Sequence, residues 1–232
     1  MGRKSKPRWV RYVFGFLLLA ALVAGGWAWW HVTHWIPPRE QYPLQGVLAG
    51  EQDGLMNFNQ VRATGGEFAY LEASDGARRQ DTQFTRNLAA AKAAGLQVGA
   101  VHRFDPCAPA ETQAANFVTV VPRDASLLPP AIELDQGGEA CEGNVSEAAV
   151  ESELMTFLNQ VEMHVGKPAV LKLSRSFEAQ HHVAARMGRN LWVSQDRFAP
   201  TYAKRPWAIW TANSRLRSEA SDHALRWLVV QP

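Results

Sequence analysis

The sequence predicts an α/β barrel of eight mostly parallel strands, preceded by one helix that crosses a membrane. Residues 12–30 form an apolar segment without a charged side chain. After residue 44, short apolar runs alternate with helical patterns, which is typical of parallel strands covered by helices. The last three apolar runs follow one another with little helix between them. The barrel is therefore expected to be regular at first and degenerate at its end.

The apolar segment near the N-terminus is close to the roughly 20 residues that span a bilayer, with Trp and Tyr at its start and Trp at its end. Basic residues lie only on its N-terminal side, which predicts a cytoplasmic tail (1–11), an uncleaved signal-anchor (12–36) and a periplasmic or otherwise extracytoplasmic domain. The alternative is a cleaved signal peptide, but bulky Trp follows the apolar core instead of a small-residue cleavage site. The bases are Arg3, Lys4, Lys6, Arg8 and Arg11.

A proline-containing stretch, residues 37–43, follows the anchor and is expected to be an extended, fairly stiff linker. The predicted barrel occupies residues 44–232. Its strands are expected at 45–49, 68–72, 97–102, 131–135, 169–173, 191–194, 207–211 and 225–230. Its helices are expected at 55–63, 82–94, 110–120, 146–165 and 177–186.

Three residues predict where helices begin or end. Gly95 follows the second helical pattern and can adopt the left-handed cap conformation. Ser146 precedes several acidic residues, an arrangement that favours a helix N-terminus. Gly166 and the proline two residues after it are expected to end that helix sharply.

Charge and cysteine content restrict the function. The net charge is +2, and without the bases of the first eleven residues the chain is slightly acidic, which argues against a general nucleic-acid binder. The two cysteines, Cys107 and Cys141, both lie in the exported part. An oxidising compartment favours a disulfide between them, with two free buried thiols as the alternative.

Candidate functional residues follow the predicted strands, because the carboxyl ends of barrel strands carry the site. Glu133 and Asp135 are two residues apart, so both side chains lie on one face of the fourth strand. Two adjacent carboxylates in a partly buried pocket repel, and the one whose pKa rises can act as a general acid. Alternatively, the pair faces water at the end of an edge strand. Asp75, His102, Trp210 and Asn213 follow other strands and are candidate substrate-binding residues.

Two of these candidates have equally plain structural interpretations. His102 either hydrogen-bonds a sugar or is a satisfied histidine in the barrel mouth. Trp210 either stacks on a sugar face or fills the core, which is the commoner use of a buried aromatic ring.

The order of motifs along residues 44–230 resembles family 25 glycoside hydrolases. Residues 68–76 (FAYLEASDG) are similar to the second strand of that family, which usually ends Ala-Thr-Glu-Gly, and residues 128–138 (LPPAIELDQGG) match its Pro-Pro-x-x-Asp-x-Glu strand without gaps. Further similar stretches are 45–47, 90–100, 101–104, 166–168 and 207–210. The resemblance implies a TIM-like (β/α)5β3 barrel and muramidase chemistry, cleavage of peptidoglycan next to N-acetylmuramic acid.

The chain departs from the family pattern at the expected site. The first strand of the family reads Gly-Ile-Asp-Val-Ser and its Asp is a catalytic carboxylate, whereas Leu48 stands at that place here. The Asp-x-Glu pair is inverted, so Asp135 takes the place of the general acid and Glu133 that of the assisting carboxylate. Glu51 and Asp53 follow Leu48 closely and are candidates to substitute for the lost acid. Arg226 stands where the last strand often carries an Asp.

Two functions are compatible with these residues. The first is a membrane-anchored muramidase that acts on the peptidoglycan glycan strand at the outer face of the cytoplasmic membrane, with Asp135 and Glu133 as its carboxylate pair. The second is a catalytically degenerate barrel that binds peptidoglycan or an envelope partner, which Leu48 favours. Hydrolysis of this kind uses carboxylates and water, so no metal or organic cofactor is implied.

Overall fold

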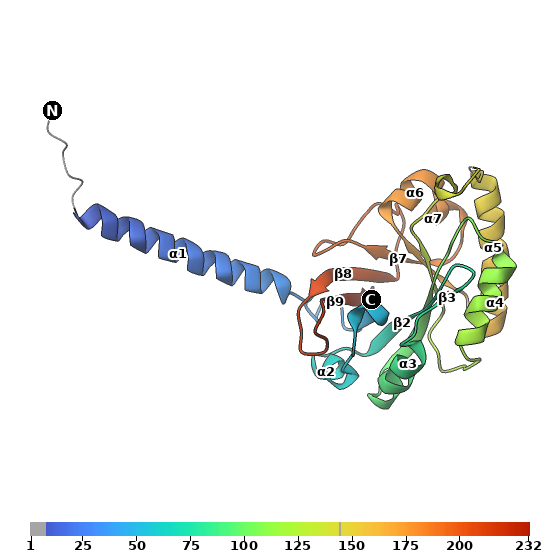
Figure 1. The fold of residues 1–232 in the computed structure, drawn as a ribbon, viewed down its shortest axis with the longest axis horizontal. Coiled ribbons are helices and arrows are strands. Elements are labelled where there is room, and N and C mark those ends of the chain that lie inside the picture. The colour runs from blue at the N-terminus through green and yellow to red at the C-terminus, as the bar shows by residue number, and fades with distance from the viewer. Residues whose placement is uncertain (1–7, 144) are drawn as a thin grey trace. The chain divides into compact units, whose positions relative to one another are not determined.

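The computed structural model describes residues 8–143 and 145–232, and the chain divides into two compact units after Trp35. The predicted basic residues Arg3, Lys4 and Lys6 lie outside the described part. The first unit contains helix α1, Arg8–Thr33 (blue in Figure 1). Its segment Tyr12–Thr33 has a mean hydropathy of 1.8 and is long and apolar enough to cross a membrane. A signal sequence near the N-terminus meets the same criterion.

The second unit is built on a mixed sheet of eight strands that curls into a barrel, with a two-residue strand, β3, at its edge (Figure 1). The strands follow the order β1-β9-β8-β7-β6-β5-β4-β2, and β1 also pairs with β2. Neighbouring barrel strands are parallel from β1 through β8, whereas β9 is antiparallel to both β8 and β1 and the edge strand β3 is antiparallel to β2. The bounds are β1 Gln45–Ala49, β2 Phe68–Asp75, β3 Arg79–Gln80, β4 Gln97–Arg103, β5 Ala131–Leu134, β6 Val170–Leu173, β7 Asn190–Ser194, β8 Ile209–Leu216 and β9 Leu225–Val230.

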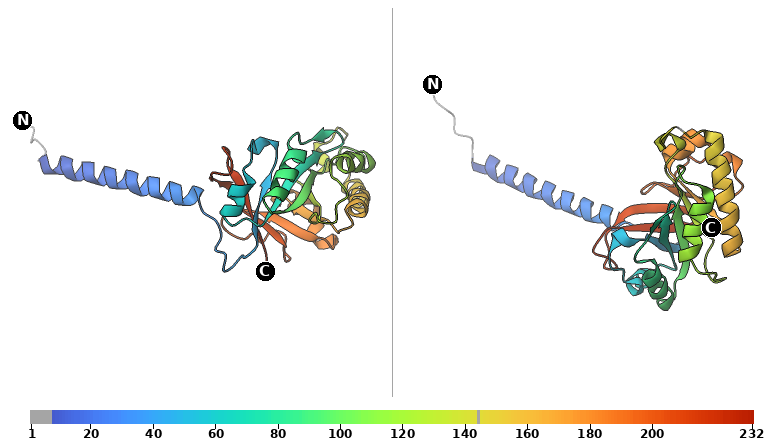
Figure 2. Two further views of the ribbon diagram at one scale, coloured as in Figure 1. Left: turned by 90° about the horizontal axis from the view of Figure 1, so that it is seen from below. Right: turned by 45° about the vertical axis from the view of Figure 1, so that its right-hand side comes forward.

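Helices connect the strands as far as β7, and Figure 2 shows α4 and α5 side by side on the outside of the sheet. The expected strands and helices lie within a few residues of the observed ones, except that the single helix expected at 177–186 is two helices. His182 separates them, because its φ of 48° is outside the helical region. The helices are α2 Phe58–Ala63, α3 Phe84–Ala93, α4 Ala110–Val120, α5 Glu147–Val165, α6 Arg175–His181 and α7 Val183–Arg186, with 3₁₀ turns at Glu51–Asp53 and Gly138–Ala140.

The predicted helix ends are confirmed. Gly95 follows α3 with a φ of 77°. The Ser146 side chain accepts a hydrogen bond from the main-chain N–H of Ala149 at the start of α5. Gly166 ends α5 in the left-handed conformation, which a residue without Cβ adopts at little steric cost.

The interior of the barrel is an apolar core below the carboxyl ends of the strands. Because side chains alternate between the two faces of a strand, every second residue points inward. Leu48, Tyr70, Val101, Trp192 and Leu228 are inward-facing members of one buried cluster. This packed layer closes the barrel below the functional groups, so the site is a pocket at one end of the barrel and does not continue through it.

Residues 37–43 differ from the extended linker that their prolines predict. The main-chain N–H groups of Gln41 and Tyr42 both donate to the carbonyl of Pro38, which turns the chain back on itself. The Tyr42 ring packs against Trp207, with centroids 6.3 Å apart. The aromatic contact and the turn therefore make this stretch part of the barrel unit.

Candidate active site

Four charged side chains form a row across the carboxyl ends of β2, β4, β5 and β6. Asp75 is the register partner of Arg103, Arg103 of Glu133, and Glu133 of Lys172. The Lys172 ammonium donates a hydrogen bond to Glu133 Oε1. Arg103 Nε lies 3.9 Å from both Glu133 Oε2 and Asp135 Oδ2. Opposite charges thus alternate along the row, and Arg103 bridges the two acids predicted to be functional.

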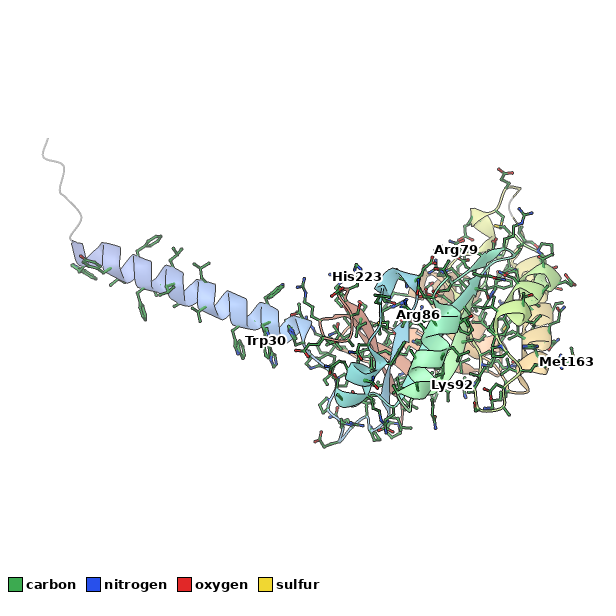
Figure 3. The ribbon with its side chains drawn as sticks, turned by 60° about the horizontal axis from the view of Figure 1, so that its bottom comes forward. Trp30, Arg79, Arg86, Lys92, Met163 and His223 are labelled. Atoms are coloured by element: carbon green, nitrogen blue, oxygen red, sulfur yellow. A yellow bond between two sulfur atoms is a disulfide. The ribbon has the colours of Figure 1, made fainter. Side chains whose placement is uncertain are left out.

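Three members of this row, Asp75, Arg103 and Glu133, line a polar pocket of about 200 Å³ at the mouth of the barrel. Arg79, which Figure 3 labels near the end of β2, contacts Glu51 and lies 3.7 Å from Asp75. Lys92, labelled at the far end of α3, marks the opposite end of the barrel. The residues lining the pocket are Glu51, Gln52, Glu72, Ser74, Asp75, Arg79, Asp81, Val101, Arg103 and Glu133.

Asp135 has the properties of a proton donor. Its side chain is 30% exposed, and among the described residues its buried Oδ1 atom has no hydrogen-bond partner. Burial raises the pKa of the Asp135 carboxyl above its usual value, and the charge of Glu133 adds to the rise although Arg103 and Lys172 oppose it. A carboxyl with a raised pKa stays protonated at a higher pH and can donate its proton.

Glu133 is held differently. Its side chain is 13% exposed, as is that of Lys172, and the two form an ion pair at the barrel mouth. The inverted pair therefore places the more exposed carboxyl at Asp135 and the more buried, cation-paired carboxyl at Glu133. The alternative of an edge strand facing water is wrong, because β5 is flanked by β4 and β6.

β1 contains no acidic residue, and Leu48, at the place of the family's acid, is fully buried in the interior cluster. Its register partner on β9 is Arg226, whose guanidinium contacts Glu72 and lies 2.6 Å from Asp53 Oδ2. Asp53 is thus buried and paired, while Glu51 lines the pocket.

Three predicted sugar-binding residues are buried and do not line the pocket: His102, Trp210 and Asn213. His102 is fully buried, and its Nδ1 hydrogen-bonds Ser74 Oγ at 2.8 Å. It faces the helical layer because its neighbours in the strand, Val101 and Arg103, face inward. The prediction that His102 contacts a sugar is therefore wrong. The alternative of a hydrogen-bonded structural histidine is correct, although His102 packs against Phe117 and Phe157 of the helical layer and not in the barrel mouth.

Trp210 and Asn213 are also buried. Trp210 donates its Nε1–H to the carbonyl of Gln195 and contacts Tyr42 edge-on at 5.7 Å. Asn213 Oδ1 accepts from the main-chain N–H of Arg215 at 2.9 Å. Sugar stacking by Trp210 and sugar binding by Asn213 are therefore contradicted by their burial, whereas Asp75 does line the pocket.

Sequence patterns do not identify two further charged residues at the barrel mouth, Lys172 beside the pocket and Glu72 in its lining. Lys172 interrupts an apolar strand, and a lysine within a buried run was the available signal that a carboxylate faces it. The sequence predicts that Glu72 lies in a strand, but it does not indicate that Glu72 belongs to the site. Glu72 pairs with Val101, but the next register pair is Ser74 with His102, so the strand is irregular at Ala73. This irregularity turns both Glu72 and Asp75 towards the pocket.

The cysteines connect two loops beside the site. Cys107, in the loop after β4, and Cys141, in the loop after β5, form a disulfide with Cα atoms 5.2 Å apart. Asp135 lies on the second of these connections, so the disulfide restrains the chain that follows the candidate proton donor.

Known proteins resemble this chain in sequence and fold. Lysozyme M1 of Streptomyces globisporus is 29% identical over 114 residues, covering 47% of this chain and 39% of that protein. An uncharacterized protein of Escherichia coli K12, YegX, is 24% identical over 155 residues, covering 64% of this chain and 53% of YegX. The chain thus matches about two fifths to one half of the length of these curated relatives.

Solved structures show the same fold. A family 25 glycosyl hydrolase from Bacillus anthracis has a TM-score of 0.76 at 23% identity, covering 86% of this chain and 93% of that one. A bacterial lysozyme from Streptomyces coelicolor has a TM-score of 0.71 at 20% identity, covering 82% and 92%. Residues 50–217 match the sequence model described as glycosyl hydrolases family 25. Since this match extends over more than half of the chain, the protein belongs to glycosyl hydrolases family 25.

Proposed function

We propose that this protein is a membrane-anchored muramidase that hydrolyses peptidoglycan glycan strands next to N-acetylmuramic acid. The observation that carries the proposal is the half-buried Asp135 carboxyl beside Glu133 at the mouth of the barrel, with its pKa raised mainly by burial. Membership of family 25 and the similarity to a protein named lysozyme support the substrate class. The succession of five strand–helix units and three further strands supports a (β/α)5β3 assignment.

Asp135 is the proton donor in the proposed reaction. Its proton passes to the glycosidic oxygen as the bond from that oxygen to the anomeric carbon breaks, and water then adds to the anomeric carbon. Glu133, held by Lys172, orients Arg103 between the two acids. Asp75 lines the cleft and is available to hydrogen-bond sugar hydroxyl groups.

The proposed location rests on α1. A helix long and apolar enough to cross a membrane, with bases on its N-terminal side, supports an anchor that leaves the hydrolase outside the cytoplasm. An anchored enzyme would cut wall material close to the membrane.

The second candidate is a barrel that binds the glycan without cutting it. Leu48 favours it, because this buried side chain replaces an acid of the family pattern. The ion pair between Lys172 and Glu133 also favours it, because it neutralises one acid of the site.

Digestion of purified peptidoglycan by the full chain in detergent distinguishes the two candidates. The muramidase releases reducing muramic acid ends, and Asp135→Asn abolishes this release because an amide cannot donate the required proton. Glu67→Gln is a matched control, since it removes an exposed carboxylate that pairs with Arg39 outside the pocket. Sedimentation of the protein with peptidoglycan, with no reducing ends released, would instead support the binding protein.

A further inference from the structure

Glu72 lies in the region that lacks the first-strand acid. Its side chain projects from β2 into the pocket that Glu133 also lines, and it is 20% exposed. Leu48 on β1 pairs with Tyr70, two residues before Glu72 on the same face of β2. The Glu72 carboxylate is therefore one strand away from position 48 and nearer the open mouth.

Gly50 leaves space for this carboxylate. A Cβ atom on Gly50 would collide with Glu72 Oε2 and lie 2.8 Å from its Cδ, closer than non-bonded carbon atoms approach. Gly50 has an extended backbone, so the side-chain space and not the backbone conformation requires glycine here. In the family pattern a serine stands at this place and an Asp stands two residues before it. The two departures, Leu48 and Gly50, thus occur together with a carboxylate that arrives from β2.

The surroundings of Glu72 keep it ionised. Arg226 hydrogen-bonds Glu72 Oε1, and the Gln52 amide donates to the same oxygen at 3.0 Å. Burial alone would raise the pKa of the Glu72 carboxyl, but Arg226, with Gln52 and Lys172, outweighs burial and lowers it. The pKa is therefore raised at Asp135 and lowered at Glu72. Opposite shifts of this kind are the usual arrangement of a catalytic acid and its ionised partner.

We propose that Glu72 is the ionised catalytic carboxylate of this site and takes the place of the acid that Leu48 removes. The assignment rests on the proposed glycan hydrolysis. Asp135 gives its proton to the leaving oxygen, which keeps the electron pair of the broken bond. Water then forms a bond to the anomeric carbon and loses one proton to Glu72. Glu72 releases this proton to solvent and Asp135 takes one up, so one water is consumed for each bond cleaved.

A purely structural ion pair with Arg226 is the competing explanation. Asp53, the other acidic partner of Arg226, has a side chain that is 4% exposed and is suited to that role. Glu72 is more exposed and lines the pocket, which a structural partner of Arg226 does not require.

Chemical rescue tests the assignment in the full chain. We expect Glu72→Ala to lower kcat for release of reducing ends by about 10²–10⁴-fold, the usual contribution of one acid–base group, with little change in KM. Azide fits the space left by the carboxylate and attacks the anomeric carbon directly. Added azide should therefore restore turnover in Glu72→Ala and yield a glycosyl azide detectable by mass spectrometry. Glu72→Gln keeps the volume and most of the hydrogen bonding, and it should lose kcat without rescue.

The variants separate this assignment from the proposed function. Circular dichroism first establishes that each variant is folded, and Glu67→Gln controls for the loss of an ion pair at the other end of β2. An active Glu72→Gln variant, or a folded Glu72→Ala variant that azide does not rescue, overturns the role of Glu72 while Asp135→Asn remains inactive. A wild-type chain that releases no reducing ends overturns the proposed function and this assignment together.

Discussion

The Lys172 ammonium and the Glu133 carboxylate form an ion pair between neighbouring strands β5 and β6, where each side chain is 13% exposed. Lys172 also lies over the Trp192 ring at 5.7 Å. The acid predicted to assist hydrolysis is therefore anchored by a base at the top of the apolar core, and its charge is available to the site only together with that of Lys172.

We expect Lys172→Met to destabilise the protein, because it leaves a largely buried carboxylate without its closest cation. Loss of one partner of a buried pair costs about 3 kcal/mol of unfolding free energy. Adding Glu133→Gln should recover part of this loss, which chemical denaturation of the two single variants and the double variant measures. Additive effects of the two substitutions would contradict an energetic coupling between these residues.

Arg103 should set the alkaline limit of hydrolysis. The proposed reaction needs protonated Asp135, so activity falls as the pH rises through the pKa of that carboxyl. The Arg103 guanidinium lowers this pKa, and Arg103→Gln should therefore raise it and move the alkaline limb of the kcat/KM profile to higher pH. Arg86→Gln, an exposed substitution on α3 (Figure 3), is the control and should leave the limb in place. A shift to lower pH would refute the assignment of Asp135 as the acid.

His102 should make the fold sensitive to acid. Burial lowers the pKa of His102 to about 4, whereas an unfolded histidine has a pKa near 6.5. The unfolded chain therefore binds a proton first as the pH falls, and His102 contributes stability above pH 6.5 that is lost between about pH 6.5 and 4. The loss amounts to about 3 kcal/mol.

The pH dependence of unfolding in His102→Gln tests this expectation. The variant should be less stable than wild type at pH 7, since it alters hydrogen bonds to Ser74 and Gln113. Its stability should nevertheless decrease less between pH 6.5 and 4. Parallel curves for wild type and variant would show that another group carries the acid sensitivity.

Removing the disulfide should lower stability and loosen the loops beside the site. Cys107 and Cys141 are 34 residues apart, and closing a loop of this length stabilises a protein by about 4 kcal/mol. The double variant Cys107→Ser, Cys141→Ser should melt at a lower temperature, measured by circular dichroism. A reductant should lower the melting temperature of the wild type but not that of the double variant. Equal melting temperatures of the oxidised wild type and the double variant would contradict a stabilising role.

Several features of the fold were predictable from local sequence. The strands β1 to β9, apart from β3, appear in the sequence as apolar segments, because most of their side chains are buried. The apolar run of α1 is equally visible in the sequence. The caps at Gly95, Ser146 and Gly166 depend on residues within one helical turn, so local chemistry was enough to locate them. The motif around Glu133 and Asp135 placed both acids at the end of one strand, where the structure also has them.

The direction in which individual side chains point was harder to predict from the sequence. The positions of His102 and Trp210 at strand ends predict a role in the site, yet both side chains face away from the barrel interior. The face that a residue occupies depends on the phase of its strand, and a shift of one residue reverses it.

The sequence by itself therefore determined the family, the order of strands and helices, the apolar segment that precedes them and the two acids at the end of β5. Only the tertiary structure decided which charges meet: Lys172 with Glu133, Arg226 with Glu72 and Asp53, and Arg103 between Glu133 and Asp135. The physical reason is that these pairs come from strands far apart in the chain. They form only when the barrel closes in its register, and the irregularity at Ala73 turns Glu72 and Asp75 to the same pocket.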